Sequence, residues 1–335
     1  MDPRGPAAGP RLSAGPLAAL AAAGGTEFPH LAAARARTEE ALRERRAALG
    51  AAAPAEDGST AVVLMGSWGR RELTSGSDDD FVVLGDGWPA PAEVREVLTR
   101  PPGQEGVFGG RVREADLVDR IGLGHDTNEN LTRRMLFLLE SVALTGEAAH
   151  AAARAAIVRS YLDAGVRDQR VPRFLLNDLI RYWRTICVDF EAKARERGED
   201  GWGLRNAKLR TSRKLLFAGG LLPVLECHEL RRAEMHATLT AAFAAPPSDR
   251  VAAAFLRYDA VDAGVRALQA YDAFLALVDD EAAREHLRSL TRDAALTDPL
   301  FRRARGYGDQ LESGLLALLF ERQPLARLVR EYGVF

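Results

Sequence analysis

Cysteine is almost absent from this chain, which contains only Cys187 and Cys227, 40 positions apart. Two widely separated cysteines supply neither a disulfide framework nor the paired spacing of a zinc site. Histidine is also scarce, and no two of the six histidines stand at metal-ligand spacing. We therefore expect two reduced, buried thiols in a cytoplasmic protein that binds no transition metal through these residues.

The chain also lacks a strong charge of either sign and any long apolar run. Lysine and arginine total 45 against 47 acidic residues, for a net charge of −2. Bulk electrostatic attraction to nucleic acid is therefore not indicated, and such binding would need a local patch. No stretch reaches the roughly 18 apolar residues that span a bilayer. The alanine-rich run 17–23 is short and ends at two glycines, so we expect a short helix or a loose arm there rather than an export signal.

What the chain does contain is enough apolar sequence for a large core. Apolar residues make up 47% of the 335 residues, a length typical of two domains. Residues 1–28 are expected to be a flexible arm, because the first 16 are rich in proline and glycine. The predicted domains after this arm are 29–147 and 148–335.

Hydrophobic periodicity predicts a different secondary-structure content for each domain. The first should alternate helices and strands, whereas strand signals end near residue 127 and the second domain should be an all-helical bundle. The fold class is therefore predicted as α+β, with a small mixed sheet. In the first domain we expect helices at 31–50, 67–73, 92–99 and 131–144 and strands at 61–65, 80–84 and 106–112.

The segment Met65–Leu84 carries the strongest chemical signal. A buried strand is expected to end at Gly66, and a second strand begins behind three consecutive aspartates. Alternate residues of a strand face the same side, so Asp78 and Asp80 should project together while Asp79 faces away. Two neighbouring carboxylates repel each other unless a cation lies between them. Mg²⁺, or Mn²⁺ in its place, is the natural ligand, because it binds carboxylates together with substrate phosphates.

The turn that precedes these aspartates supplies groups for phosphate. Gly66 allows a phosphate to approach the backbone, and Ser67 adds a hydroxyl donor at an expected helix start. Arg70 lies one helical turn further on and can pair with phosphate oxygens. Together these residues predict a triphosphate-and-magnesium site. Such a site supports in-line displacement at phosphorus with pyrophosphate leaving.

The pattern Gly66-Ser67-x-Gly69-Arg70 followed by Ser77-Asp78-x-Asp80 resembles the signature of the polymerase-β-like nucleotidyltransferase superfamily. It is most similar to the group of the uridylyltransferase that modifies PII signal proteins. The similarity is good over about 25 residues, which include Glu72-Leu73, and weaker out to about residue 147. The stretch Leu138–Gly146 resembles the helix that follows the catalytic sheet in that group. The resemblance implies a nucleoside triphosphate substrate, metal-binding catalytic residues Asp78 and Asp80, and a protein tyrosine or a small molecule as acceptor.

The chain departs from that family pattern at two places. The family usually has an apolar residue between the two acids, where this chain has Asp79. We expect Asp79 either at an exposed strand end or paired with an arginine. The family also needs a third carboxylate from a later strand, and Asp116 is preferred over Glu114 and Asp119 although none lies in a clear strand pattern.

Basic residues gather on two predicted helices of the second domain. Arg205 and Lys208 share a helix face with Ser212, and a preceding helix carries Arg181 and Arg184 at similar spacing. One interpretation places these faces at the cleft, where Arg205 and Lys208 would help to bind the triphosphate or an acidic acceptor. The other interpretation is that they are solvated faces that balance nearby acidic residues.

Two functions from different classes follow from these observations. The leading hypothesis is a magnesium-dependent nucleotidyltransferase that moves a nucleoside monophosphate from a nucleoside triphosphate to a hydroxyl of a protein or small-molecule acceptor. The alternative is a catalytically weak or inactive nucleotide-sensing or interaction module, such as a toxin–antitoxin partner, that lacks the third carboxylate. Nucleic acid is the less favoured partner because of the overall charge.

Overall fold

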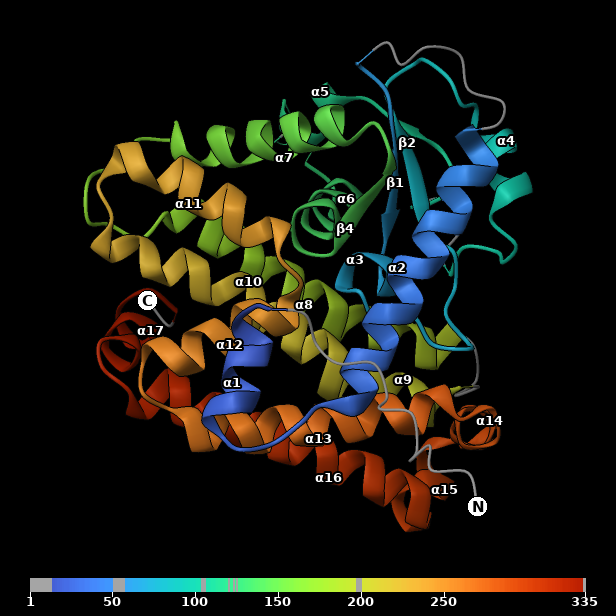
Figure 1. Cartoon of the computed structure of the whole chain (residues 1–335). Helices are drawn as coiled ribbons and strands as arrows, with labels where there is room; N and C mark the ends of the chain where they lie inside the picture. The colour runs from blue at the N-terminus through green and yellow to red at the C-terminus, as the bar shows by residue number, and fades with distance from the viewer. Residues whose placement is uncertain are drawn as a thin grey trace, which may run out of the picture.

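The computed structural model describes residues 14–50, 58–103, 107–119, 121–122, 124, 126–196 and 201–333. These residues form an α+β fold in which a mixed sheet lies on one side of a large assembly of helices (Figure 1). The sheet order is β3-β2-β1-β4, with β1 antiparallel to β2 and β4, and β2 parallel to β3. The strands are β1 (Ala61–Met65), β2 (Phe81–Leu84), β3 (Arg111–Val112) and β4 (Ser141–Thr145).

Both faces of the sheet are covered, which explains the continuous apolar runs in its strands. Val62 and Leu64 of β1 pack in one cluster with residues of α2 (Pro29–Gly50) and α4 (Pro91–Val97). Val63 and Met65 face the other way, into the main core that includes α6 (Asn128–Leu139) and α7 (Glu147–Leu162). This alternation follows from the two-residue period of a strand.

Strand β4 corrects the predicted helix 131–144 and the statement that strand signals end near residue 127. Helix α6 ends at Leu139, Glu140 leaves the helical region with φ −145°, and the chain then pairs antiparallel with β1. The resemblance of Leu138–Gly146 to a helix is therefore wrong. Leu138, Leu139 and Val142 happen to keep helical spacing across the junction, which hides the change of structure.

From Glu147 onward, the described residues contain helices and no strand. No helix among them, or elsewhere in the described part of the chain, is long and apolar enough to cross a bilayer. Cys187 and Cys227 are both free thiols; Cys227 is buried as expected, whereas the expectation is wrong for Cys187, which is only half-buried. After α7, the elements are α8 (Arg173–Glu196), α9 (Trp202–Lys208), the π-helix η1 (Leu209–Arg213), α10 (Lys214–Glu226), η2 (Cys227–Glu229), α11 (Arg232–Ala244), α12 (Pro247–Arg257), α13 (Val261–Asp279), α14 (Glu281–Ser289), α15 (Arg292–Thr297), α16 (Pro299–Leu316), η3 (Ala317–Glu321) and α17 (Leu325–Gly333).

The segment expected to be a flexible arm contains a docked helix, α1 (Pro16–Ala23). Its side chains Leu17 and Leu20 are fully buried, and the helix packs against α12 and α13. The backbone N–H of Leu17 donates to Asp249 Oδ1 at 3.1 Å. Apolar residues three and four positions apart thus give this short segment a buried face. Of the two alternatives for 17–23, the short helix is confirmed, and the flexible arm is wrong for these residues. Residues 1–13 of the predicted arm lie outside the described residues.

Helix α13 binds to segments that are far away in the sequence. Asp272 accepts a hydrogen bond from the backbone N–H of Leu31 at 2.7 Å, at the start of α2. Asp279, at the other end of α13, accepts one from the backbone N–H of Ser75 at 2.7 Å. The helical part of the chain therefore supports both the first long helix and the loop that precedes the aspartates.

Candidate nucleotide and metal site

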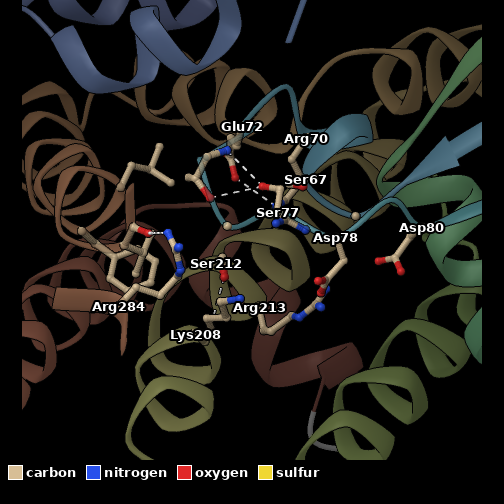
Figure 2. Close-up of a pocket in the computed structure, with 16 residues that line it drawn as sticks. Ser67, Arg70, Glu72, Ser77, Asp78, Asp80, Lys208, Ser212, Arg213 and Arg284 are labelled. Carbon is tan, nitrogen blue, oxygen red and sulfur yellow. Dashed lines mark hydrogen bonds and ion pairs between the residues drawn. The ribbon is translucent and has the colours of Figure 1, made fainter. Parts of the chain in front are cut away.

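A polar pocket lies at the end of the sheet where β1 finishes and β2 begins (Figure 2). It encloses about 80 Å³, whereas pockets for whole small molecules commonly hold roughly 300–1,000 Å³. The space suits phosphate groups and a metal ion better than an entire nucleotide. The lining residues are Gly66, Ser67, Arg70, Glu72, Thr74, Gly76, Ser77, Asp78, Asp80, Lys208, Ser212, Arg213, Phe274, Leu275, Val278 and Arg284.

Gly66 forms the turn between β1 and the pocket. Its backbone angles of φ 65° and ψ −130° are accessible almost only to glycine. A Cβ atom at this position would also lie 3.0 Å from Asp80 Oδ2, so the missing side chain lets the carboxylate approach the turn. Ser67 lines the pocket at the start of α3 (Ser67–Arg70), a single turn that is shorter than the predicted helix 67–73.

The three consecutive aspartates divide between two environments. Asp78 and Asp80 line the pocket, and a Cβ on Gly103 would lie 2.8 Å from Asp78 Oδ2 and 3.5 Å from Asp80 Oδ1. Asp79 is turned away and buried, where it accepts hydrogen bonds from Trp68 Nε1 at 3.0 Å and the backbone N–H of Arg100 at 2.9 Å. Asp79 is therefore a structural anchor, neither an exposed strand end nor the partner of an arginine side chain.

Asp80 occupies an electrostatically unfavourable position. Burial raises the pKa of its carboxyl group to about 6, and the neighbouring carboxylates of Asp78 and Glu140 act in the same direction. The backbone N–H of Gly103, which donates to Asp80 Oδ1 at 2.8 Å, and the positive charge of Arg213 lower the pKa only in part. At neutral pH this site thus holds negative charge that a further cation would stabilise.

Glu140 is the third carboxylate near Asp80, and the sequence reasoning missed it. Its side chain is fully buried at the junction of α6 and β4. Oε1 accepts a hydrogen bond from Arg213 Nη1 at 2.9 Å, and Oε2 accepts one from Arg70 Nη1. The available signal was a single acidic residue inside the apolar run 135–144. A lone acid in such a run is costly to bury without a cationic partner.

Asp116, the predicted third carboxylate, lies far from this pocket. It belongs to α5 (Glu114–Val118), which follows β3. Because β3 runs parallel to β2, the chain leaves β3 at the opposite end of the sheet from Asp80. Asp116 pairs with Arg113 at 3.2 Å instead. The preference for Asp116 is therefore wrong, and Glu114 on the same short helix is excluded by the same topology.

Arg70 lines the pocket, but protein carboxylates bind most of its guanidinium. Nε donates to Glu72 Oε2 at 2.9 Å, and Nη1 donates to Glu140. Burial alone would lower the pKa of Arg70, but the two carboxylates outweigh this effect and raise it. Arg70 is thus held as a fixed cation between Glu72 and Glu140. It has less freedom to bind phosphate than the sequence suggested.

Glu72 adds an acceptor to the pocket wall. Its Oε2 also accepts a hydrogen bond from Tyr271 on α13 at 2.6 Å. Its Oε1 is buried and has no hydrogen-bond partner among the described residues. A buried carboxylate oxygen without a partner is unfavourable, so a donor or a cation in the pocket would stabilise the site. Burial accordingly raises the pKa of Glu72 against the opposing influence of Arg70.

The helical part of the chain contributes cations through the π-helix η1, which interrupts one long helix between α9 and α10. The hydroxyls of Thr211 and Ser212 donate to carbonyls four residues earlier, which loosens the helical ladder. The wider turn brings Lys208, Ser212 and Arg213 to the same side of the pocket, facing Ser67 and Asp78 (Figure 2). π-Helical turns of this kind occur frequently at functional sites.

Lys208 is the pocket cation that is best placed to meet an anion. Burial, followed by the positive charge of Arg213, lowers its pKa to about 8, and Asp78 opposes this shift. No ion pair or hydrogen bond involves its ammonium group within the described ranges. Arg284 of α14 provides a second cation: its Nη1 donates to Ser75 Oγ at 2.8 Å, and its guanidinium packs against Gly76.

Arg205 does not reach the pocket. It lies beside Gly201, where an added Cβ would be 3.3 Å from Arg205 Nη1, and it is not among the lining residues. Lys208 and Ser212 of the predicted face do line the pocket, and Arg213 of the π-turn lies there with them, so the prediction is wrong for Arg205 alone.

A larger pocket adjoins the first on the other side of Asp80. It encloses about 670 Å³ and shares Asp80 and Arg213 with the smaller pocket. Glu140 forms part of its inner wall. Its remaining walls combine apolar side chains with polar ones near the rim: Val107, Phe108, Asn128, Glu129, Thr132, Leu136, Arg181, Tyr182, Arg184, Thr185, Ile186, Val188, Asp189 and Lys193.

The residues of the small pocket fit a metal ion that arrives with phosphate groups. Within the described residues, no group of three or more His, Cys, Asp or Glu side chains is arranged to bind a metal. Asp78 and Asp80 offer two carboxylates, while both oxygens of Glu140 are bound by arginines. Mg²⁺ commonly binds through one or two carboxylates together with substrate phosphates. The donor set therefore suits a metal–triphosphate complex better than a metal held by protein alone.

Comparison with known proteins does not supply a function for this chain. No protein-family model, no curated protein and no solved structure matches it. The resemblance of Gly66–Asp80 to the nucleotidyltransferase signature thus stays a prediction. A fold alone does not determine function, so the function has to be argued from the groups that meet in the pocket.

Proposed function

We propose that the protein is a nucleotidyltransferase that transfers a nucleoside monophosphate from a nucleoside triphosphate to a hydroxyl group, with Mg²⁺ or Mn²⁺. One observation carries the proposal: two carboxylates and a glycine–serine turn line the same small pocket as cations from the helical part of the chain. Asp78 and Asp80 would hold the metal. Carboxylates for a metal and cations for phosphate in one pocket match the needs of phosphoryl transfer.

The phosphate side of the reaction belongs to the small pocket. Ser67 would donate its hydroxyl to a phosphate oxygen beside the Gly66 turn, which lines the same pocket. Lys208 and Arg284 would stabilise the charge that develops on the leaving pyrophosphate. The metal, when bound, supplies electrostatic stabilisation of the attacking and leaving oxygens.

The acceptor would enter through the larger pocket. In an in-line displacement the attacking and leaving oxygens stand on opposite sides of the phosphorus. With pyrophosphate in the small pocket, the attacking hydroxyl must approach from the other side of Asp80, where the larger pocket lies. Its volume of about 670 Å³ is within the usual range for small-molecule sites, so we favour a small molecule over a protein tyrosine as acceptor.

The proposal is tested by nucleotide binding and transfer in parallel. Calorimetry with each nucleoside triphosphate, with and without Mg²⁺, should show magnesium-dependent binding that the double variant Asp78→Asn/Asp80→Asn loses. Transfer of a labelled nucleoside monophosphate to an added hydroxyl compound should disappear in the same variant. Asp116→Asn is the matched control, since it removes one aspartate far from the pocket. Unchanged magnesium-dependent binding and transfer in the double variant would refute the proposal.

The nucleotide-sensing alternative is favoured by one specific observation. Both oxygens of Glu140 are bound by Arg70 and Arg213, so the third carboxylate near Asp80 is neutralised by protein cations. A binding module needs the turn and the cations but not a free third carboxylate. Tight nucleotide binding by the wild type, without transfer to any of a broad set of hydroxyl compounds, would favour this second function.

A further inference from the structure

Arg213 stands at the junction of the two pockets. It lines both of them, as does Asp80. Its Nη1 donates to Glu140 Oε1 at 2.9 Å, yet its side chain is 36% exposed while that of Glu140 is fully buried. A partly exposed cation thus covers a buried anion at the point where the phosphate side meets the acceptor side.

The two arginines that bind Glu140 differ in how firmly they are held. Arg70 is 11% exposed and pairs with Glu72 as well as Glu140. Arg213 pairs with Glu140 alone among the described residues, and it extends from a π-turn. Moving Arg70 would leave the buried carboxylate of Glu72 without its cation. After a movement of Arg213, by contrast, the carboxylate of Glu140 would still be paired with Arg70. Arg213 is therefore the arginine that can change partners at lower cost.

We propose that Arg213 is a displaceable counter-cation, which neutralises Glu140 and Asp80 in the nucleotide-free protein and moves onto the triphosphate when a metal–nucleotide complex binds. This inference rests on the proposed function. The movement would release Oε1 of Glu140, which lines the larger pocket together with Asp80, as a free carboxylate oxygen. It would also join the two pockets, because Arg213 forms part of their common wall.

Charge balance explains why the exchange is favourable. Without a metal, the carboxylates of Asp78, Asp80 and Glu140 need the positive charge of Arg213, and this charge would repel an incoming divalent cation. A metal bound to a triphosphate supplies both a replacement cation for the carboxylates and anionic oxygens for Arg213. Arginine suits this second role, since its planar guanidinium pairs with phosphate oxygens through two donors.

The test measures Mn²⁺ binding by electron paramagnetic resonance in the absence of nucleotide. Removing the competing charge in Arg213→Gln should tighten Mn²⁺ binding by about tenfold, because like charges a few ångströms apart in a partly buried site repel strongly. This gain should not extend to Mn²⁺ that is added with a triphosphate, because the variant lacks the guanidinium that would pair with the phosphate oxygens. Arg213→Lys, which keeps the charge, should retain the wild-type affinity for Mn²⁺.

Arg210→Gln is the matched control. It removes the same charge from the same π-helix, but Arg210 pairs with Asp309 at 3.4 Å and lines neither pocket. Its affinity for Mn²⁺ should equal that of the wild type. Thermal unfolding of each variant shows whether it folds, and the partial exposure of Arg213 makes both of its substitutions tolerable.

The outcomes separate the inference from the function on which it rests. If Asp80→Asn abolishes Mn²⁺ binding while Arg213→Gln binds Mn²⁺ no more tightly than the wild type, the counter-cation role is wrong and the proposed metal site survives. If Mn²⁺ binds neither the wild type nor Arg213→Gln, with or without a triphosphate, the proposed function fails and the inference fails with it. Tighter Mn²⁺ binding in Arg213→Gln alone, without a change in Arg210→Gln, supports the inference.

Discussion

Replacing Asp80 by asparagine is expected to stabilise the nucleotide-free protein at neutral pH, although it removes a proposed metal ligand. The folded protein raises the pKa of this carboxyl group from 3.8 to about 6, chiefly through burial. The unfolded chain therefore loses its proton near pH 4, whereas the folded protein keeps it until near pH 6. Folding becomes less favourable as the pH rises between these values, and the full penalty applies above about pH 7.

The size of the effect follows from the shift. About two pKa units correspond to about 3 kcal/mol at 1.36 kcal/mol per unit, and the partial exposure of Asp80 reduces this to about 2 kcal/mol. The Asp80→Asn variant should gain this amount above about pH 7 and roughly half of it near pH 5. The backbone N–H of Gly103 keeps an acceptor, because the asparagine amide retains an oxygen.

Urea unfolding of the variant and the wild type at about pH 5 and about pH 8, without metal or nucleotide, measures this difference. Asp79→Asn is the matched control, and its expected change in the free energy of unfolding has the opposite sign. Asp79 accepts hydrogen bonds from Trp68 and Arg100 through both oxygens, so its replacement should lower the free energy of unfolding by about 1–3 kcal/mol. The reasoning would be refuted if Asp80→Asn is less stable than the wild type at about pH 8. It would also be refuted if the gain in the free energy of unfolding is the same at about pH 5 and about pH 8.

Three further predictions concern the packing behind the site. Arg134→Met should lower the free energy of unfolding by about 3–5 kcal/mol, because it leaves two buried aspartates without their cation; a loss under about 1 kcal/mol in chemical unfolding would contradict this. Burial and then Arg154 lower the pKa of His150 to about 3, so the wild type should lose stability as the pH falls below about 6.5, and His150→Gln should lose less over the same pH series. Gly69→Ala should cost about 2 kcal/mol in thermal unfolding, since the added Cβ would lie 2.0 Å from the carbonyl oxygen of Glu140; an unchanged melting temperature would count against it.

The sequence allowed prediction of those parts of the fold that depend on local patterns. Strands β1 and β2 are short apolar runs rich in branched residues and bounded by turn residues, so their limits were within one residue of the observed ones. Strand β4 escaped detection because Leu139 and Val142 continue the spacing of α6 beyond the residue where the helix ends. Periodicity detects the spacing of apolar residues, so it does not detect the end of the helix at Glu140.

Local sequence patterns likewise allowed prediction of only part of the site. Asp78, Asp80 and the Gly66 turn are close in sequence, and the two-residue period was enough to predict their common orientation. Glu140 lines the larger pocket together with Asp80, and Arg284 lines the small pocket, and both come from distant elements. An acidic residue inside an apolar run indicates that Glu140 needs a cationic partner but not where it lies. The prediction for Arg205 failed because helical spacing places residues on one side of a helix but does not determine which of them reaches a pocket; Arg205 lies beside Gly201 instead.

Helix α13 has a consequence for how the chain can be divided. It binds α2 through Asp272, the loop before the aspartates through Asp279, and Glu72 of the pocket through Tyr271. A fragment that ended at residue 147 would lack α13, and these groups would lose their hydrogen-bond partners. The sheet region would therefore not persist as an autonomous unit. We expect a single cooperative unfolding transition, in which the loop before the aspartates and the distant helix α13 lose their order at the same temperature.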